Sequence, residues 1–228
     1  MTPGHPAEPF WYALTDQHRA ELREMGTRND YHPETVVIRE GERTDFAFVV
    51  MDGCVKISAT GRHGYQTILG LRDAGELVGE LAGLDGGRRS ATVSALSAVE
   101  GLLLPADRFT PFLRRHPTAA AILHRTVSMR LREADRYRSA AGSEAVPQRF
   151  AALLLHLAKR YGLQVDGGGV LIDLPLSQED LAGLILTSKR TLGRILEGWR
   201  TDGIIVTGRR TMLLHSLDAL RTIARNNP

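Results

Sequence analysis

Cysteine and long apolar runs are nearly absent from this sequence. Its 228 residues include one cysteine, Cys54, which excludes an internal disulfide, a multi-cysteine metal site and a cysteine-ligated iron–sulfur cluster. Apolar runs such as residues 151–155 fall far short of the roughly 20 residues that cross a bilayer. The N-terminal stretch has neither the positive start nor the apolar centre of a signal peptide. We therefore expect a cytoplasmic protein with no membrane partner.

Catalytic and metal-binding motifs are missing as well. The eight histidines are scattered along the chain, and neither an HExxH motif nor a Ser/His/Asp arrangement is legible. The glycine-rich segment lacks the GxxxxGK[ST] motif of nucleotide hydrolases. We expect neither an enzyme nor a metal site.

Charge is distributed unevenly, although the net charge is only +3. From residue 147 onward there are 11 Lys and Arg against 7 Asp and Glu, whereas the preceding residues carry 18 against 19. A basic C-terminal part beside a neutral N-terminal part indicates a polyanionic partner for the C-terminal part. The alternative is that the charges are scattered at random along the chain and indicate no partner.

Short β-rich runs divided by turn residues occupy residues 35–104. Many short strands at this spacing predict an all-β barrel or a double sheet. Before them, residues 10–30 have apolar side chains near helical spacing and predict a helix. The runs are residues 36–38, 46–51, 55–59, 67–71, 92–95 and 101–104.

The sequence predicts a long helix from Pro117 to about Ala141. Proline suits the first turn of a helix, which supports a start at Pro117. The apolar side chains of this helix form one stripe, which either packs against its own domain or pairs with a second copy of the chain. Residues 141–147 then predict a hinge between domains. The stripe comprises Leu123, Val127, Leu131 and Ala134, and the opposite faces carry Arg125, Arg130, Arg132, Arg136 and Arg138.

The segment 79–90, GELAGLDGGRRS, combines a Gly-Glu pair, a one-turn helix and an Arg-Ser pair. Such a segment suits a small phosphorylated ligand. Unpaired N–H groups at a helix start attract an anion, and Arg89 and Ser90 can donate hydrogen bonds to phosphate oxygens. Glu80 is expected to point the other way and to accept from a ribose hydroxyl. The alternative is an ordinary glycine-rich connection with a solvated arginine.

Two short helices with capping signals follow in the C-terminal part. Ser177 and Asp180 predict a capping box, and a second helix start at Thr187-Ser188 leads into residues 189–199. This pair matches a helix-turn-helix. Its second helix gathers Lys189, Arg190 and Arg194, which are explained best by contact with nucleic acid. Beyond it, Arg209 and Arg210 lie at the turn of a predicted hairpin that resembles a wing and would contact phosphates.

Both motifs resemble those of the cyclic-AMP receptor protein and FNR family. GEL, then DGG and RSAT, resemble the family's phosphate-binding cassette, and SQEDLAGLILTSKRTLGRIL is similar to its helix-turn-helix. The resemblance covers roughly residues 30–215. It implies an α+β protein with an N-terminal jelly-roll domain (1–116), a dimerisation helix (117–142) and a C-terminal winged helix-turn-helix domain (143–228).

The resemblance also implies the function and its residues. The expected protein is a homodimeric transcription regulator that binds double-stranded DNA, is controlled by cAMP or cGMP as an allosteric ligand, and has RNA polymerase as a further partner. The ligand residues are Gly79, Glu80, Leu81, Arg89, Ser90 and Asp135. The DNA-contacting residues are Ser188, Lys189, Arg190, Thr191, Arg194, Arg209 and Arg210.

Three departures from the family pattern qualify these expectations. Leu186 stands where the family's turn usually has glycine, so the turn is expected to differ or to be strained. Lys189-Arg190 replaces an Arg-Glu pair, so the preferred DNA sequence should differ, because arginine favours guanine or phosphate.

The third departure concerns the base of the ligand. The resemblance places Ala134 and Asp135 where cAMP-responsive members have a Thr-Ser pair that contacts adenine. Asp135 either accepts from adenine or guanine donors or is a solvated surface charge. An alternative function follows: the same DNA-binding regulator with a degenerate, ligand-independent β-roll. A redox or gas sensor is less expected, because one cysteine cannot carry a cysteine-ligated iron–sulfur cluster; the visible spectrum of the purified protein would show whether haem is present.

Overall fold

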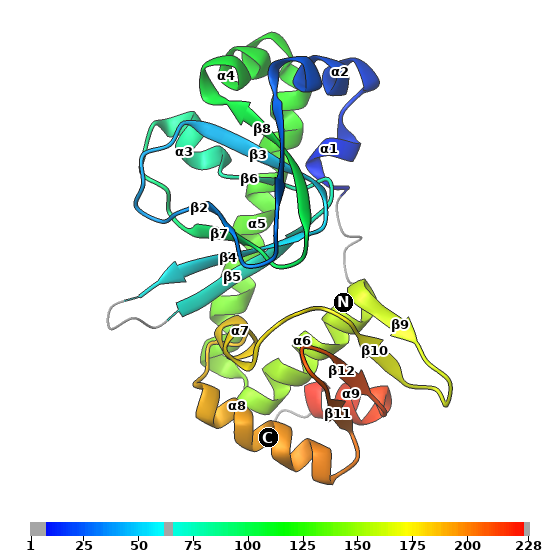
Figure 1. The fold of residues 1–228 in the computed structure, drawn as a ribbon. Coiled ribbons are helices and arrows are strands. Elements are labelled where there is room, and N and C mark those ends of the chain that lie inside the picture. The colour runs from blue at the N-terminus through cyan, green and yellow to red at the C-terminus, as the bar shows by residue number, and fades with distance from the viewer. Residues whose placement is uncertain (1–7, 62–65, 226–228) are drawn as a thin grey trace. The chain divides into compact units, whose positions relative to one another are not determined.

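The computed structural model describes residues 8–61 and 66–225 (Figure 1). The chain divides into two compact units, the first formed by residues 1–64 and 69–134 and the second by residues 65–68 and 135–228. The division falls within the long helix α5 (Pro117–Ser143), and the domain boundaries expected from the sequence stay a prediction.

Two four-stranded antiparallel sheets form the β-roll of the first unit. The first sheet has the order β1-β8-β3-β6 and comprises β1 (Thr27–Tyr31), β3 (Phe46–Asp52), β6 (Leu77–Val78) and β8 (Val99–Pro105). The second has the order β2-β7-β4-β5 and comprises β2 (Val36–Ile38), β4 (Cys54–Thr60), β5 (Gln66–Asp73) and β7 (Thr92–Ala95). A core cluster that includes Phe48, Val55 and Val93 draws on strands of both sheets. The predicted α+β fold with a jelly-roll domain is confirmed.

The helix predicted over residues 10–30 is wrong in its extent. The chain forms α1 (Phe10–Ala13) and α2 (Asp16–Met25), and β1 begins two residues later. Thr15 caps α2 by accepting from the His18 N–H, and Gly26 ends it. A Cβ at Gly26 would lie 2.6 Å from Leu102 Cδ1, so the chain passes against β8 here and pairs with it as a strand.

A helix that the sequence analysis omitted, α4 (Ala106–Arg115), packs apolar side chains beside α1 and α2. Phe109 and Phe112 are buried in the same cluster as Phe10 and Leu22. His18 is also buried there, and burial and the nearby His116 lower the pKa of His18.

Helix α5 (Pro117–Ser143) is the long helix predicted from Pro117. Its apolar stripe is buried at the N-terminal end only: Leu123 is 2% exposed and Leu131 is 61% exposed. Arg130 was expected on a solvent-facing side, but its side chain is only 19% exposed. One chain therefore leaves the C-terminal half of the stripe uncovered.

The second unit contains the predicted pair of short helices, α7 and α8, together with a small sheet (Figure 1). Its four-stranded antiparallel sheet has the order β11-β12-β10-β9, and α6 packs against α9. Phe150 of α6 stacks on Trp199 of α8 with ring centroids 5.1 Å apart. The elements are α6 (Val146–Tyr161), β9 (Gly162–Gln164), β10 (Val170–Ile172), α7 (Gln178–Leu184), α8 (Lys189–Thr201), β11 (Ile205–Thr207), β12 (Met212–Leu214) and α9 (Leu217–Arg225).

The hinge predicted over residues 141–147 is shorter in the structure. Helix α5 continues to Ser143 and α6 begins at Val146, so only Glu144 and Ala145 lie between the two helices. Ala145 is the N-cap of α6, and its N–H donates to the Gln148 side chain at 2.7 Å.

Candidate functional site

The glycine-rich segment forms a short helix, α3 (Glu80–Asp85), between two glycines with left-handed backbone. Gly79 has φ 72° and Gly86 has φ 69°, a conformation that costs other residues roughly 1–2 kcal/mol. A Cβ at Gly79 would also lie 2.6 Å from Ile38 Cδ1 and 2.7 Å from Arg89 Nη1. Gly79 is therefore required both for the turn and for the approach of Arg89, and we call residues 79–90 the cassette.

Arg89 is 3% exposed and points into the protein. Its Nε donates to Thr44 Oγ1 (2.6 Å), Nη1 to the Gly79 oxygen (2.5 Å) and Nη2 to the Phe46 oxygen (2.6 Å). The guanidinium also lies over the Phe46 ring, 4.6 Å from its centroid. Burial lowers the pKa of Arg89, and the charges of Asp45 and Glu80 partly oppose that shift. These partners hold a buried cation beside the start of α3.

Glu80 is 5% exposed and pairs with helix α5. Arg130 Nη1 donates to Glu80 Oε1 at 2.9 Å, and Arg130 Nη2 donates to the Leu77 oxygen at 2.7 Å. Glu76 lies 3.8 Å from Arg130 and 3.5 Å from Arg72. Burial and the neighbouring Arg130 lower the pKa of Arg72. The structure thus joins the cassette to α5 through a cluster of two arginines and two glutamates.

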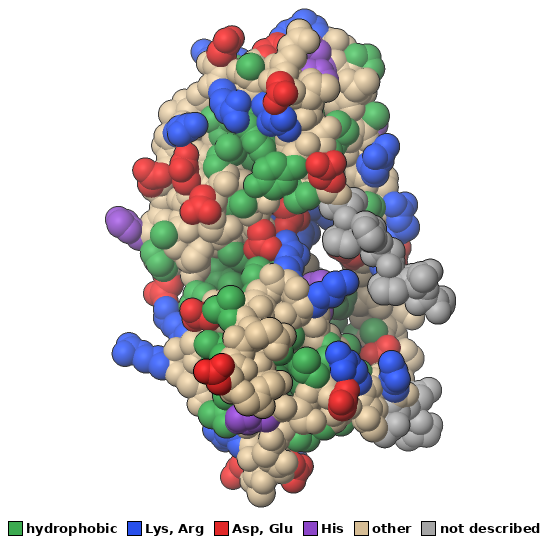
Figure 2. Space-filling model, turned by 90° about the vertical axis from the view of Figure 1, so that its right-hand side faces the viewer, with side chains coloured by type: hydrophobic (Ala, Val, Ile, Leu, Met, Phe, Trp, Pro, Cys, Tyr) green, Lys and Arg blue, Asp and Glu red, His purple; other side chains and the backbone are tan. Residues whose placement is uncertain are grey.

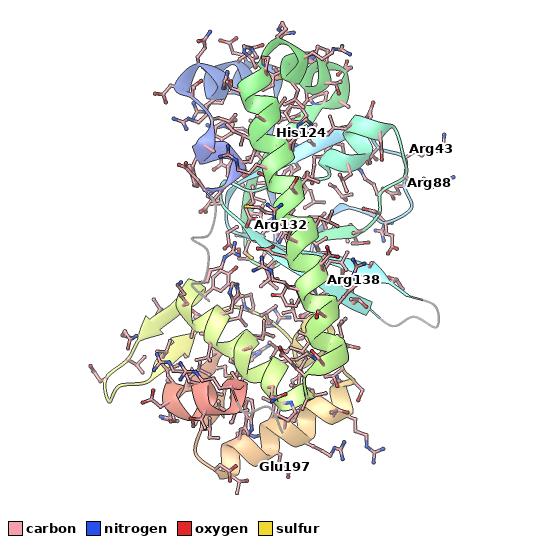
Figure 3. All side chains as sticks on the ribbon, turned by 180° about the vertical axis from the view of Figure 1, so that it is seen from behind. Arg43, Arg88, His124, Arg132, Arg138 and Glu197 are labelled. Atoms are coloured by element: carbon pink, nitrogen blue, oxygen red, sulfur yellow. The ribbon has the colours of Figure 1, made fainter. Side chains whose placement is uncertain are left out.

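The other predicted ligand residues lie outside this cluster. Leu81 and Ser90 are exposed on the cassette. Arg88 is exposed too, with Nη1 on the Gly41 oxygen at 2.8 Å, and it projects away from the β-roll as Arg43 does (Figure 3). Asp135 is 56% exposed and pairs with Arg138. It follows Arg130 by five residues, about 140° around a helix of 3.6 residues per turn, so it lies on a different side of α5 from the residue that contacts Glu80.

The predicted caps of the helix-turn-helix are confirmed. Ser177 Oγ accepts from the Asp180 N–H at 3.1 Å, and the Ser177 N–H donates to Asp180 Oδ2 at 2.9 Å. Ser188 Oγ accepts from the Thr191 N–H at 3.1 Å at the start of α8. Leu186 has φ 52°, so the strain expected where glycine is usual is present.

Helix α8 separates its charged and apolar residues. Lys189, Arg190 and Arg194 are exposed, whereas Leu192 and Leu196 are buried against the rest of the unit. Thr191 is partly buried, and its Oγ1 lies 2.9 Å from Ser188 Oγ. On the face drawn in Figure 2, basic and acidic side chains are interspersed. The basic side chains of α8 are themselves exposed to solvent.

The wing turn between β11 and β12 places two more arginines at the surface. Arg209 and Arg210 are exposed, and Arg210 has φ 63°. The Gly208 N–H donates to the Thr211 oxygen at 2.9 Å and closes the turn. Beside it, Arg200 of α8 donates to Thr207 Oγ1 at 3.3 Å.

Comparison with known proteins decides the family. Residues 28–116 match the family described as cyclic nucleotide-binding domain, and residues 148–223 match the Crp-like helix-turn-helix domain. The cyclic AMP receptor protein of Thermus thermophilus is 30% identical over 216 residues, which cover 95% of this chain and 96% of that protein. The chain belongs to the Crp/Fnr family.

Another curated relative and two solved structures are also similar to this chain. The CRP-like cAMP-activated global transcriptional regulator of Mycobacterium tuberculosis is 27% identical over 86% of this chain and 87% of that protein. The c-di-GMP responsive regulator CLP of Xanthomonas campestris has a TM-score of 0.79 at 22% identity, covering 89% of this chain and all of that chain (100%). FixK2 of Bradyrhizobium japonicum has a TM-score of 0.73 at 21% identity, covering 89% and 99%.

This Crp/Fnr protein is a DNA-binding transcription regulator and not an enzyme. Crp-family regulators act as dimers. Within residues 8–61 and 66–225, no helix is long and apolar enough to span a membrane, and no cluster of His, Cys, Asp and Glu could hold a metal ion.

Two arginines of this regulator were missed as site residues. Arg130 contacts Glu80 across 50 positions of sequence. Arg149 of α6 donates to the Ile185 oxygen of the helix-turn-helix and to the Glu144 oxygen before α6. The sequence carries only a weak signal for Arg130. Arg130 lies close to the apolar stripe of α5 rather than opposite it, and a position near the stripe favours partial burial. Contacts of Arg149 with backbone oxygens have no side-chain signature to search for.

Proposed function

We propose that this regulator binds a cyclic nucleotide at the cassette and that binding changes its affinity for DNA. The observation that carries the proposal is that a buried arginine and a buried glutamate lie beside the same glycine. Arg89 is 3% exposed and Glu80 is 5% exposed, and both adjoin Gly79. A buried cation suits a phosphate, and a buried carboxylate suits a ribose hydroxyl.

The residues present fit the phosphate and ribose of such a ligand. Gly79 leaves room for Arg89, because a Cβ at position 79 would collide with the guanidinium. Arg89 would hold the phosphate, and Ser90 would donate a further hydrogen bond to it. Glu80 would accept from the ribose, and the exposed Leu81 would cover its edge. Asp135 would contact the base from a second copy of the chain, which is compatible with both cAMP and cGMP.

The ion pair between Glu80 and Arg130 would let a ligand on the cassette affect the position of α5. A ribose hydroxyl on Glu80 would share the carboxylate that now accepts from Arg130 at 2.9 Å. Binding can shift the protein between arrangements only as far as its affinity for them differs. We therefore expect the contact between the cassette and α5 to differ with and without ligand.

On DNA, α8 would enter the major groove. Lys189, Arg190 and Arg194 would contact base edges or phosphates, with Ser188 and Thr191 beside them. Arg209 and Arg210 of the wing would contact phosphates. In a dimer the two copies of α8 should lie about 34 Å apart, one turn of the duplex. We place this function in the cytoplasm, with RNA polymerase as a further partner.

Calorimetry with cAMP and with cGMP tests the ligand. We expect at least one to bind the full-length protein and Arg89→Ala to abolish that binding. Arg88→Ala is the matched control, because it removes an exposed neighbour of the same type and should retain binding. Absence of binding by both nucleotides to the folded wild type would contradict the proposal.

A second candidate is a regulator whose β-roll binds no ligand. It is favoured by the three protein oxygens that already accept from Arg89. Selection of DNA from a random library, with and without each nucleotide, separates the two. Identical selected sequences and affinities in every condition would support the second candidate.

A further inference from the structure

The turn before α8, the helix proposed to enter the major groove and called the recognition helix below, receives hydrogen bonds from one arginine of another helix. Arg149 of α6 directs both Nε and Nη2 at the Ile185 oxygen, each at 3.1 Å. Ile185 is the C-cap of α7, where backbone oxygens lack helical partners and attract a cation. The guanidinium therefore stabilises the end of α7 immediately before the turn.

The same arginine reaches the junction between α5 and α6. Its Nη1 donates to the Glu144 oxygen at 2.5 Å, and Glu144 is one of the two residues between those helices. The Glu144 N–H donates to the Ala140 oxygen at 2.8 Å, so Glu144 continues the turn that ends α5. One planar group thus connects the end of α5 with the end of α7.

Apolar packing between these two places is incomplete. A cavity of about 160 Å³ is lined by Tyr137 and Ala140 of α5, by Arg149 and His156 of α6, and by Leu186 of the turn. Leu186 follows Ile185 directly and has φ 52°, and its N–H is 3.4 Å from the Gly183 oxygen. A strained turn beside a cavity depends more on its polar contacts than a packed turn does.

We propose that Arg149 is a positioning residue for DNA recognition: it sets the turn before α8 according to the position of the end of α5. Arg149 itself does not contact DNA in this role. Movement at Glu144 would change how the guanidinium meets the Ile185 oxygen, and the start of α8 would move with the turn. Arginine is required because its donors lie in a rigid fork that serves two oxygens at once.

Three full-length variants test this role. Arg149→Met keeps most of the side-chain length and removes every donor. Arg149→Lys keeps the charge but must serve both oxygens from one nitrogen. Arg160→Met is the matched control: it removes an exposed arginine of the same helix whose cation lies 5.5 Å from the Tyr161 ring.

The readout is the ratio of affinities for two duplexes of equal length. One is the sequence selected by the wild type from a random library, and the other is a random sequence. For Arg149→Met we expect specific affinity to fall about tenfold, the size of one mismatched base pair. Affinity for random DNA should match that of Arg160→Met, because it depends on phosphate neutralisation. Arg149→Lys should give an intermediate ratio.

Structural damage alone would lower both affinities together and leave the ratio of the wild type, which would overturn the proposal. A ratio that falls equally in Arg160→Met would overturn it as well. If Arg149→Met does not fold, the ratio measured for Arg149→Lys decides: a fall supports the positioning role, and an unchanged ratio contradicts it.

Discussion

The arginines of the cassette and of the recognition helix α8 differ in burial and in hydrogen bonding. Arg89 is 3% exposed and donates to three protein oxygens. Arg190 and Arg194 are exposed, and in the part of the chain that the structure describes neither guanidinium has an ion pair or hydrogen bond. A ligand would therefore have to displace or share existing contacts of the cassette, whereas DNA would meet cations that have no protein partner among the described residues. Substitutions should affect folding at the first site and binding at the second.

The largest effect is expected for Glu80→Ala. It leaves Arg130, 19% exposed, without its closest carboxylate, and we expect the free energy of unfolding to fall by about 3 kcal/mol. Urea denaturation measures the change. Asp218→Ala is the control, since its pair with Arg221 is 91% and 53% exposed and should contribute less than about 0.5 kcal/mol. Equal effects of the two variants would show that the cassette pair is no more important for folding than a surface pair.

Adding Arg130→Met to Glu80→Ala sharpens that result. Once the carboxylate is gone, removing the cation relieves a partly buried charge, so the double variant should lose less than the sum of the two single losses. Strict additivity would mean that the two side chains do not stabilise each other.

Gly79→Ala should have the next largest effect. The new Cβ must adopt φ near 72° and would meet Ile38 and Arg89 within 2.7 Å, and we expect a loss of about 2 kcal/mol. Gly86→Ala has a similar φ of 69° but no atom within 4 Å, so it should lose only about 1 kcal/mol. Thermal or urea unfolding compares them. If Gly86→Ala is the more destabilised, close packing of Arg89 is not what requires Gly79.

At the recognition helix the expected loss is in binding rather than folding. Arg194→Ala should weaken affinity for the selected DNA by about tenfold, or 1.4 kcal/mol. Its free energy of unfolding should stay within about 0.5 kcal/mol of the wild type. Glu197→Gln, an exposed residue of the same helix (Figure 3), should bind DNA at least as tightly as the wild type. Fluorescence anisotropy measures the binding. A large loss of stability in Arg194→Ala would remove the contrast between the two sites.

The sequence predicts contacts between residues close together in the chain better than contacts between distant residues. The caps at Ser177 and Ser188 depend on atoms three residues apart, so they were predicted and are confirmed. The turn at Gly79 and the strain at Leu186 are also local. By contrast, Arg89 contacts Thr44 from 45 positions away, and Arg130 contacts Glu80 from 50. Such pairs depend on tertiary structure that no local pattern reports.

The sequence analysis also missed a strand and placed the hinge over too many residues, because the local sequence of each is misleading. Strand β1 (Thr27–Tyr31) is largely polar and is ordered by pairing with β8, so its sequence gives no alternating signal. The hinge was predicted over residues 141–147, which include Gly142 and Pro147. In the structure Gly142 lies inside α5 and Pro147 lies at the first turn of α6, where proline is tolerated.

The smallest predicted effect lies at the turn beside the recognition helix. Leu186 has φ 52° and is 41% exposed, so its side chain contributes little burial while its backbone is strained. Leu186→Gly removes both the side chain and the strain, whereas Leu186→Ala removes the side chain and keeps the strain. The glycine variant should therefore be more stable than the alanine variant by about 1 kcal/mol, even though glycine gains more freedom in the unfolded chain. Urea denaturation of the two proteins measures the difference. An alanine variant as stable as the glycine variant would mean that the turn relaxes without strain.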